Sequence, residues 1–175
     1  VVGIDRRDGR VTGVVTDRGP IEAEYVVNCA GMWAKHIGAL AGVSVPLQAI
    51  EHAYLISEPF EGVSPDLPIL EDPDRFAYYR EETGGLMVGL FEPVAAPWSL
   101  DGIPDDFSFG EIASDWDRLA PFLEYAMEIL PGLEDVGIRK LFTGPESFTP
   151  DNGFLVGEAP ELDRFFVAAG FNSLG

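Results

Sequence analysis

The chain has 175 residues, of which 46% are hydrophobic, so it is long enough for one sizeable domain or two small ones. Its 30 acidic residues exceed its 11 basic residues, and the formal net charge is −19. A surface of that sign repels nucleic-acid phosphates and anionic lipid headgroups, so we expect neither nucleic acid nor membrane as a partner.

The only cysteine is Cys29, which excludes an internal disulfide. We expect a free, buried thiol there, in a reducing compartment: the cytoplasm, or the mitochondrial matrix in a eukaryote. No uninterrupted apolar run approaches the length of a membrane-spanning helix. The chain starts within a predicted strand and stops within a predicted turn, so we expect a fragment of a longer protein.

The first quarter of the chain is predicted to be an antiparallel meander followed by a strand and a helix. Asp8-Gly9 is a strong hairpin signal between two apolar segments. An apolar run over 25–27 predicts a buried strand, and apolar residues at helical spacing over 32–40 predict a helix that ends at Gly42.

The middle of the chain is predicted to hold antiparallel strands and one long helix. Thr83-Gly84-Gly85 marks the clearest hairpin, and Ser114 is the expected N-cap of a helix that runs to about Leu130. That helix has an apolar stripe from Trp116 to Leu130, which is typical of helix core. The predicted strands cover 47–57, 76–82, 86–91 and 138–148, the last interrupted at Gly144-Pro145, and 58–74 is predicted to be irregular.

A second strand-and-turn pattern closes the chain. Short strands are predicted at 154–156 and 165–168, and a glycine-rich turn follows at 170–175. The order predicts a mixed α/β fold, in which a Rossmann-like nucleotide-binding layer carries an inserted antiparallel sheet.

The stretch from Tyr25 to Ala34 has a strand that stops abruptly at small residues. Cys29, Ala30 and Gly31 leave almost no side-chain volume, so another molecule could approach the backbone. A strand that enters a helix through such a turn can direct backbone N–H groups at a phosphate or nucleotide. An ordinary tight turn explains the same residues.

Six sets of segments along nearly the whole chain carry a resemblance to known proteins: 26–34 (VVNCAGMWA), 41–43 with 46–47, 51–54 (EHAY), 77–80 with 85–89, 144–151 and 167–173. In this order they resemble one flavoenzyme family, the D-amino-acid-oxidase-like FAD-dependent oxidoreductases, and within it the dimethylglycine and sarcosine dehydrogenase branch.

The resemblance implies FAD as the cofactor and a small-molecule amine as the substrate. It also implies FAD-binding parts at 1–45 and 149–175 and a substrate-binding antiparallel-sheet domain at 46–148. The family's Gly-x-Gly-x-x-Gly phosphate loop is absent from these residues, as is the upstream histidine that often carries the flavin covalently, so neither His36 nor His52 is given that role. A folate-binding region could lie beyond Gly175.

Two segments are implied to contact FAD. The first is Asn28, Cys29, Ala30 and Gly31 with Trp33, and simple packing of strand on helix is its alternative. The second is Gly170, Phe171, Asn172, Ser173 and Gly175, whose backbone N–H groups would stabilise negative charge on the reduced flavin. A helix N-cap at Asn172 or Ser173 is compatible with that role.

His52 and Tyr78 are the candidates for the catalytic face. Hydride leaves an N-methyl carbon only when the amine lone pair is free, and a histidine can accept the proton that blocks it. Tyr78 and Tyr54 could orient the amine or its carboxylate, and Arg80 could pair with the carboxylate. The alternatives are structural: His52 hydrogen-bonded to a neighbour in its strand, tyrosines packed in the core, and Arg80 on the surface in ion pairs with Glu81 and Glu82.

Three functions follow. The first is an FAD-dependent oxidoreductase that oxidises the C–N bond of a secondary or tertiary N-methyl amino acid by hydride transfer to flavin, with the fragment alone inactive. The second is a relative that acts on another amino acid or on glycerol phosphate. The third is a flavin-binding scaffold without turnover.

Overall fold

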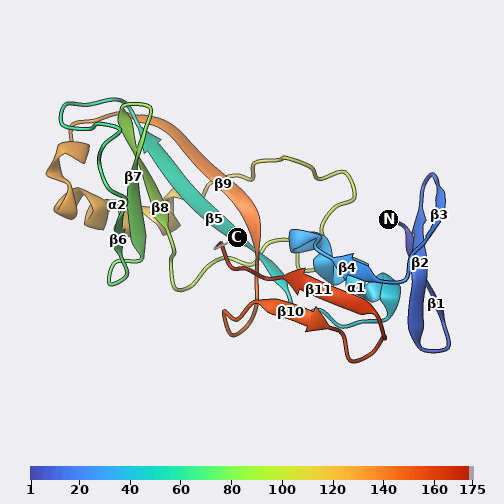
Figure 1. The fold of residues 1–175 in the computed structure, drawn as a ribbon. Coiled ribbons are helices and arrows are strands. Elements are labelled where there is room, and N and C mark those ends of the chain that lie inside the picture. Colours follow the sequence, from blue (N-terminus) through green and yellow to red (C-terminus); the bar gives the residue numbers. More distant parts are fainter. Residues whose placement is uncertain (174–175) are drawn as a thin grey trace. The chain divides into compact units, whose positions relative to one another are not determined.

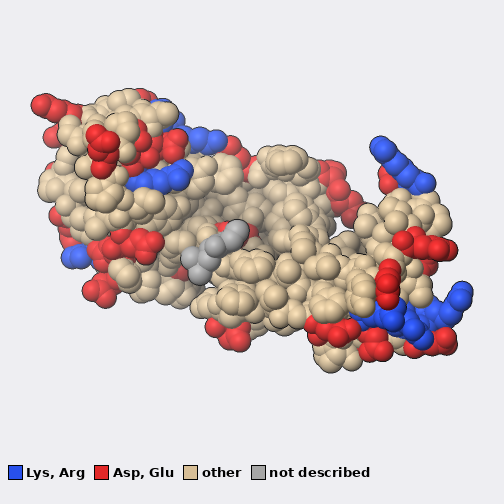
Figure 2. Space-filling view, in the orientation of Figure 1, with Lys and Arg blue, Asp and Glu red and all other residues tan. Residues whose placement is uncertain are grey.

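The computed structural model describes residues 1–173, which form two compact units. Unit 1 comprises residues 1–50, 97–107 and 146 onward, and unit 2 comprises 51–96 and 108–145 (Figure 1). No helix within the described residues is long and apolar enough to cross a bilayer. Acidic side chains are spread widely over the face drawn in Figure 2, where Lys and Arg side chains are few.

Unit 1 begins with the predicted meander. Strands β1 (Gly3–Arg7), β2 (Arg10–Thr16) and β3 (Gly19–Glu22) form an antiparallel sheet in that order. The hairpin prediction is confirmed, because Asp8 and Gly9 have φ values of 51° and 77°, the left-handed pair that a tight two-residue hairpin turn needs.

The second sheet of unit 1 joins the two ends of the chain. Its order is β10 (Leu155–Glu158), β11 (Phe165–Ala169), β4 (Val26–Asn28), and β11 runs parallel to β4 and antiparallel to β10. A short helix η1 (Gly31–Trp33) and helix α1 (Ala34–Ala41) follow β4, and Gly42 ends α1 in the left-handed conformation with φ 74°.

The core of unit 1 forms where α1 packs on this sheet and on the meander. Its buried members include Phe165, Val167, Ala34 and Val11. Gly38 is needed at this contact, because a Cβ there would lie 2.6 Å from Val45 Cγ2 and 2.9 Å from the Val43 carbonyl.

Unit 2 is built on a five-stranded sheet of order β6-β7-β8-β5-β9 (Figure 1). The first residues of β5 and the last residues of β9 belong to unit 1. The bounds are β5 (Gln48–Ser57), β6 (Leu70–Asp72), β7 (Ala77–Glu82), β8 (Gly85–Leu90) and β9 (Ile138–Phe148). Helix α2 (Trp116–Ile129) and the short helix η2 (Pro131–Leu133) complete it.

The sheet of unit 2 has two different faces. One face packs its apolar side chains, Leu55, Val88 and Leu90 among them, with Leu119 and Ala126 of α2. On the other face the strand registers place Tyr54, Gly89 and Tyr78 side by side on β5, β8 and β7. Because side chains alternate along a strand, His52, Tyr54, Tyr78, Phe91 and Phe142 share this second face, here called the aromatic face.

Six expectations need correction. The run 25–27, expected to be a buried strand, is largely exposed: Tyr25 and Val27 are each 57% exposed, because side chains alternate along β4 and only Asn28 is fully buried. Cys29 is exposed rather than buried, since Asn28 before it points inward and the alternation of a strand turns the next side chain outward. Asp115 rather than Ser114 caps α2, by accepting a hydrogen bond from Arg118 N at 3.1 Å.

The other three corrections concern β9, β6 and Trp116. Strand β9 runs through Gly144-Pro145 without a break, and β6 lies inside the stretch expected to be irregular. Trp116, expected in the helix core, is 49% exposed at the first position of α2.

A charged cluster lies at the start of α2, on the helix-covered face of the sheet. Arg118 Nη2 donates to Glu51 Oε2 at 2.5 Å, and Arg118 Nε lies 3.3 Å from Glu92 Oε1. Burial raises the pKa of the Glu92 carboxyl, while the charges of Arg118 and His52 oppose that rise and Glu51 adds to it. Ionised Glu92 therefore costs the fold stability.

Replacing Glu92 with Gln tests this cost. The folded state binds the Glu92 proton more tightly than the unfolded state, so the wild type should gain stability relative to Glu92→Gln as the pH falls through the raised pKa toward 4.5. Hydrogen exchange of β8 and α2 peptides in the full-length protein, corrected for intrinsic rates, measures the difference. Glu134→Gln at an exposed site is the control, and a gap independent of pH would contradict the prediction.

Replacing Gly89 with Ala tests the row of side chains on the aromatic face. A Cβ at Gly89 would lie 1.9 Å from Tyr78 Cε1, so the ring must move. We expect the β7–β8 hairpin to lose about 1–3 kcal/mol by hydrogen exchange. Gly137→Ala in the same unit should be nearly neutral. The double variant Gly89→Ala/Tyr78→Ala should not show the clash, and an equal effect of Gly89→Ala in both backgrounds would contradict the contact.

Candidate functional site

A cavity of about 450 Å³ opens in unit 1 where the parallel strands β4 and β11 end. Ligands of parallel α/β sheets bind at the carboxyl ends of the strands, so the cavity has the expected place in the fold. Its lining brings together segments about 140 residues apart in the chain: Cys29, Gly31, Glu146, Ser147, Ala168, Ala169, Gly170, Phe171, Asn172 and Ser173.

The backbone of this cavity is held in unusual conformations. Gly31 has φ 55° and a Cβ there would meet nothing within 4 Å, so the chain presents bare backbone to open space. Gly170, Asn172 and Ser173 have φ values of 72°, 52° and 70°. Left-handed residues other than glycine cost roughly 1 kcal/mol or more each and cluster at binding sites.

The turn after β11 is fixed by its neighbours. A Cβ at Gly170 would lie 2.5 Å from Thr149 Cγ2, which excludes a side chain there. Thr149 N donates to Asn172 Oδ1 at 2.9 Å, so Asn172 ties the turn to the end of β9. The helix that Asn172 or Ser173 would cap, and the predicted contact Gly175, lie outside the described residues.

Asn28 lies beneath the first turn. It is 3% exposed, its Nδ2 donates to the Ala34 carbonyl at 2.9 Å, and its Oδ1 accepts from Ala30 N at 3.3 Å. The side chain thus braces the turn that carries Cys29 and Gly31.

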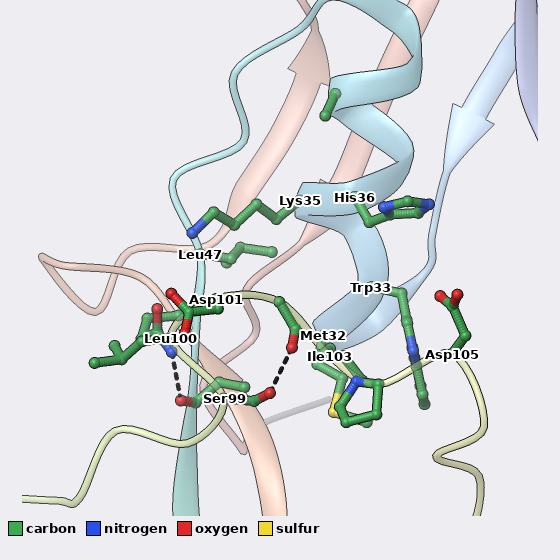
Figure 3. Close-up of a pocket in the computed structure, with 15 residues that line it drawn as sticks. Met32, Trp33, Lys35, His36, Leu47, Ser99, Leu100, Asp101, Ile103 and Asp105 are labelled. Carbon is green, nitrogen blue, oxygen red and sulfur yellow. Dashed lines mark hydrogen bonds between the residues drawn. The ribbon is translucent and has the colours of Figure 1, made fainter.

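Trp33 lines a different cavity of unit 1, of about 610 Å³, between α1 and the loop 99–105 (Figure 3). Lys35 and His36 of α1 share this lining with Asp101 and Asp105 of the loop. Of the predicted cofactor residues, Cys29, Gly31 and 170–173 therefore meet in one cavity, and Trp33 does not join them.

All four predicted residues of the substrate side, His52, Tyr54, Tyr78 and Arg80, lie in unit 2 on one face of the sheet. The His52 ring lies 4.7 Å from the Phe91 ring, and Tyr78 lies 5.7 Å from the same ring. Tyr54 stacks on Phe142 at 4.9 Å. The neighbouring Tyr79 points the other way and is buried on the helix side of the sheet.

Arg80 lies at the margin of the face. It is exposed, and its Nη2 donates to Glu82 Oε2 at 3.0 Å. A guanidinium held so loosely can turn to a carboxylate ligand, because surface ion pairs contribute little.

Three residues of the aromatic face were missed: Phe91, Gly89 and Phe142. The alternation of the predicted strand 86–91 places Phe91 and Gly89 on one face, so this signal was available in the sequence. The pairing of Phe142 with Tyr54 follows from the neighbouring positions of β5 and β9, which no local pattern gives.

The two units have different chemical capacities. The small-residue cavity of unit 1 suits an elongated ligand that needs close approach to backbone N–H groups, such as part of a dinucleotide. The aromatic face of unit 2 offers ring surfaces to a small organic molecule, and its histidine is a side chain of the type that can accept a proton near neutral pH. Among the described residues no group of three or more His, Cys, Asp or Glu is arranged to hold a metal ion.

Known proteins resemble the chain along nearly its full length. It is 42% identical over 170 residues to 4-methylaminobutanoate oxidase (formaldehyde-forming) of Paenarthrobacter nicotinovorans, which covers 97% of this chain and 20% of that protein. It is 45% identical over 166 residues to mitochondrial sarcosine dehydrogenase of Mus musculus, which covers 95% of this chain and 18% of that protein.

A third relative is named as a regulatory subunit. The mitochondrial pyruvate dehydrogenase phosphatase regulatory subunit of Mus musculus is 39% identical over 172 residues, covering 97% of this chain and 20% of that protein. The chain thus spans about a fifth of the length of these relatives.

The fold has a solved counterpart in the L-proline dehydrogenase from P. horikoshii. That structure superposes with a TM-score of 0.76 at 24% identity and covers 97% of this chain and 43% of the other. The predicted mixed α/β fold is confirmed by this likeness, and the family model described as FAD dependent oxidoreductase matches residues 1–175. The chain belongs to the DAO family of FAD-dependent oxidoreductases.

Proposed function

We propose that the full-length protein oxidises the C–N bond of a secondary or tertiary N-methyl amino acid. The observation that carries the proposal is the aromatic face, where His52 and Tyr78 both contact Phe91. The names of the relatives point to the same substrate class, since sarcosine and 4-methylaminobutanoate both carry an N-methyl amine and a carboxylate.

Unit 1 is assigned to the cofactor. Bound FAD would supply the acceptor for two electrons and a proton. Cys29, Gly31 and the turn 170–173 would lie against it through backbone N–H groups, while Asn28 supports the first of these turns. The domain boundaries expected from the sequence, at 45/46 and 148/149, remain part of this proposal.

Unit 2 is assigned to the substrate. An N-methyl amine is mostly protonated at neutral pH, and its C–H hydride cannot leave until the lone pair is free. The His52 imidazole would accept that proton at a ring nitrogen. Tyr78 would orient the amine, and Tyr54 or Arg80 would hold the carboxylate through a hydroxyl or a guanidinium.

Replacing His52 with Ala tests the proton-accepting role. In anaerobic single-turnover mixing with sarcosine or dimethylglycine, we expect flavin reduction to slow by about 10²–10⁴-fold. His36→Ala is a matched control, because His36 is exposed on α1 of unit 1. An unchanged reduction rate for His52→Ala, at equal FAD content, would remove the role.

Replacing Asn28 with Ala tests the cofactor side. The change leaves a buried carbonyl and a backbone N–H without their partner, at a cost of about 1–3 kcal/mol. We expect weaker FAD retention after dialysis, by roughly tenfold or more in the dissociation constant. As a control, Thr12→Ala on β2 of the same unit should retain FAD as the wild type does. If Asn28→Ala also retains FAD fully, the hydrogen bonds of Asn28 do not contribute to FAD binding.

A second candidate function is a flavin-binding scaffold without turnover. The similarity to a relative named as a regulatory subunit favours it. The wild-type protein separates the two: bleaching of the flavin by an N-methyl amino acid supports the enzyme, and a flavin that binds but never bleaches supports the scaffold. The compartment, and a folate-binding region outside residues 1–175, remain predictions.

A further inference from the structure

We propose that Arg118, with Glu51 and Glu92, forms a positioning cluster that sets the His52 ring against Phe91 from the opposite side of the sheet. The inference deepens the proposed function and rests on it for the role of His52. Arg118 is a positioning residue here, since it acts through the two carboxylates and lies on the helix-covered face.

The connection runs through chain neighbours. Glu51 directly precedes His52, and Glu92 directly follows Phe91. Because successive side chains of a strand leave on opposite faces, the carboxylates point toward α2 while His52 and Phe91 lie on the aromatic face. The Arg118 guanidinium holds both carboxylates. Each carboxylate is the chain neighbour of one ring, so Arg118 also fixes the positions of the His52 and Phe91 rings, which lie 4.7 Å apart.

The cluster is anchored at each of its ends. Arg118 is the third residue of α2, and its own N–H donates to the capping carboxylate of Asp115. Glu51 N donates to the Ala96 carbonyl at 2.9 Å, and Phe91 N donates to the Phe76 carbonyl at 2.7 Å. Movement of the guanidinium would therefore displace the backbone at Glu51 and at Phe91.

The charges of the cluster do not serve stability alone. The Glu92 side chain is 3% exposed, and its Oε1 and Arg118 Nε lack a hydrogen-bond partner among the described residues, although they lie 3.3 Å apart. Two carboxylates share one guanidinium in a poorly hydrated place, and a buried ion pair of this kind is often less stable than apolar packing. A charged cluster at this position is consistent with a role in the site beside it.

A double-mutant cycle in the full-length holoenzyme tests the proposal. In the wild-type background, Arg118→Met should lower the limiting rate of flavin reduction by sarcosine or dimethylglycine at least tenfold, with less than threefold change in the substrate dissociation constant. In a His52→Ala background the same change should alter the rate less than twofold, because the group on which Arg118 acts is gone. Arg118→Lys, which keeps the charge, should restore part of the rate.

The control is Arg139→Met on β9, an exposed arginine whose Nη2 donates to Thr83 Oγ1 and the Glu82 carbonyl. It should leave the rate unchanged in both backgrounds. Equal rate losses for Arg118→Met with and without His52 would show a general structural effect and overturn the proposal.

A second measurement is independent of turnover. Diethyl pyrocarbonate modifies accessible imidazoles, and peptide mapping by mass spectrometry follows His52 alone. Release of the ring in Arg118→Met should raise its modification rate at least threefold, with no change in Arg139→Met, and an unchanged rate at His52 would overturn the positioning. If the wild-type flavin is not reduced by the amines, the proposed function fails. The rate at which diethyl pyrocarbonate modifies His52 then still decides whether the cluster holds the ring.

Discussion

The register of β5, β8 and β7 is the constraint on which the substrate side of this protein depends. It sets Tyr54, Gly89 and Tyr78 in one row and sends Leu55, Val88 and Tyr79 to the other face, against α2. A slip of one residue would exchange the two faces, burying the polar tips and exposing the core. The apolar packing on α2 therefore fixes the position of the aromatic face from the opposite side of the sheet.

The cofactor side depends on a different kind of constraint. Strands β4 and β11 come from the two ends of the chain and pair in parallel, so their following turns meet at one edge. The turns differ in how they are made. At Gly31 the backbone is simply uncovered, whereas the turn 170–173 is held in left-handed conformations by Thr149 and Asn172.

Much of this could be predicted from the sequence, because the strongest signals were local. Asp8-Gly9 and Thr83-Gly84 dictate left-handed turns, and the β-strand and helix periods around them set the elements. The prediction that Cys29 is buried was wrong, because the direction in which its side chain leaves the end of β4, rather than its residue type, decides its exposure. The Glu51–Arg118–Glu92 cluster and the pairing of Tyr54 with Phe142 join residues far apart in the chain, and no periodicity reports such contacts.

The exposure of Cys29 has a practical consequence. The chain has no other cysteine, and this one lies in the lining of the cavity between the ends of β4 and β11. Within residues 1–175, thiol-selective labelling is therefore confined to one position, in the lining of this cavity. A maleimide dye or a spin label attached to Cys29 would lie at the lining of this cavity and would report its occupancy.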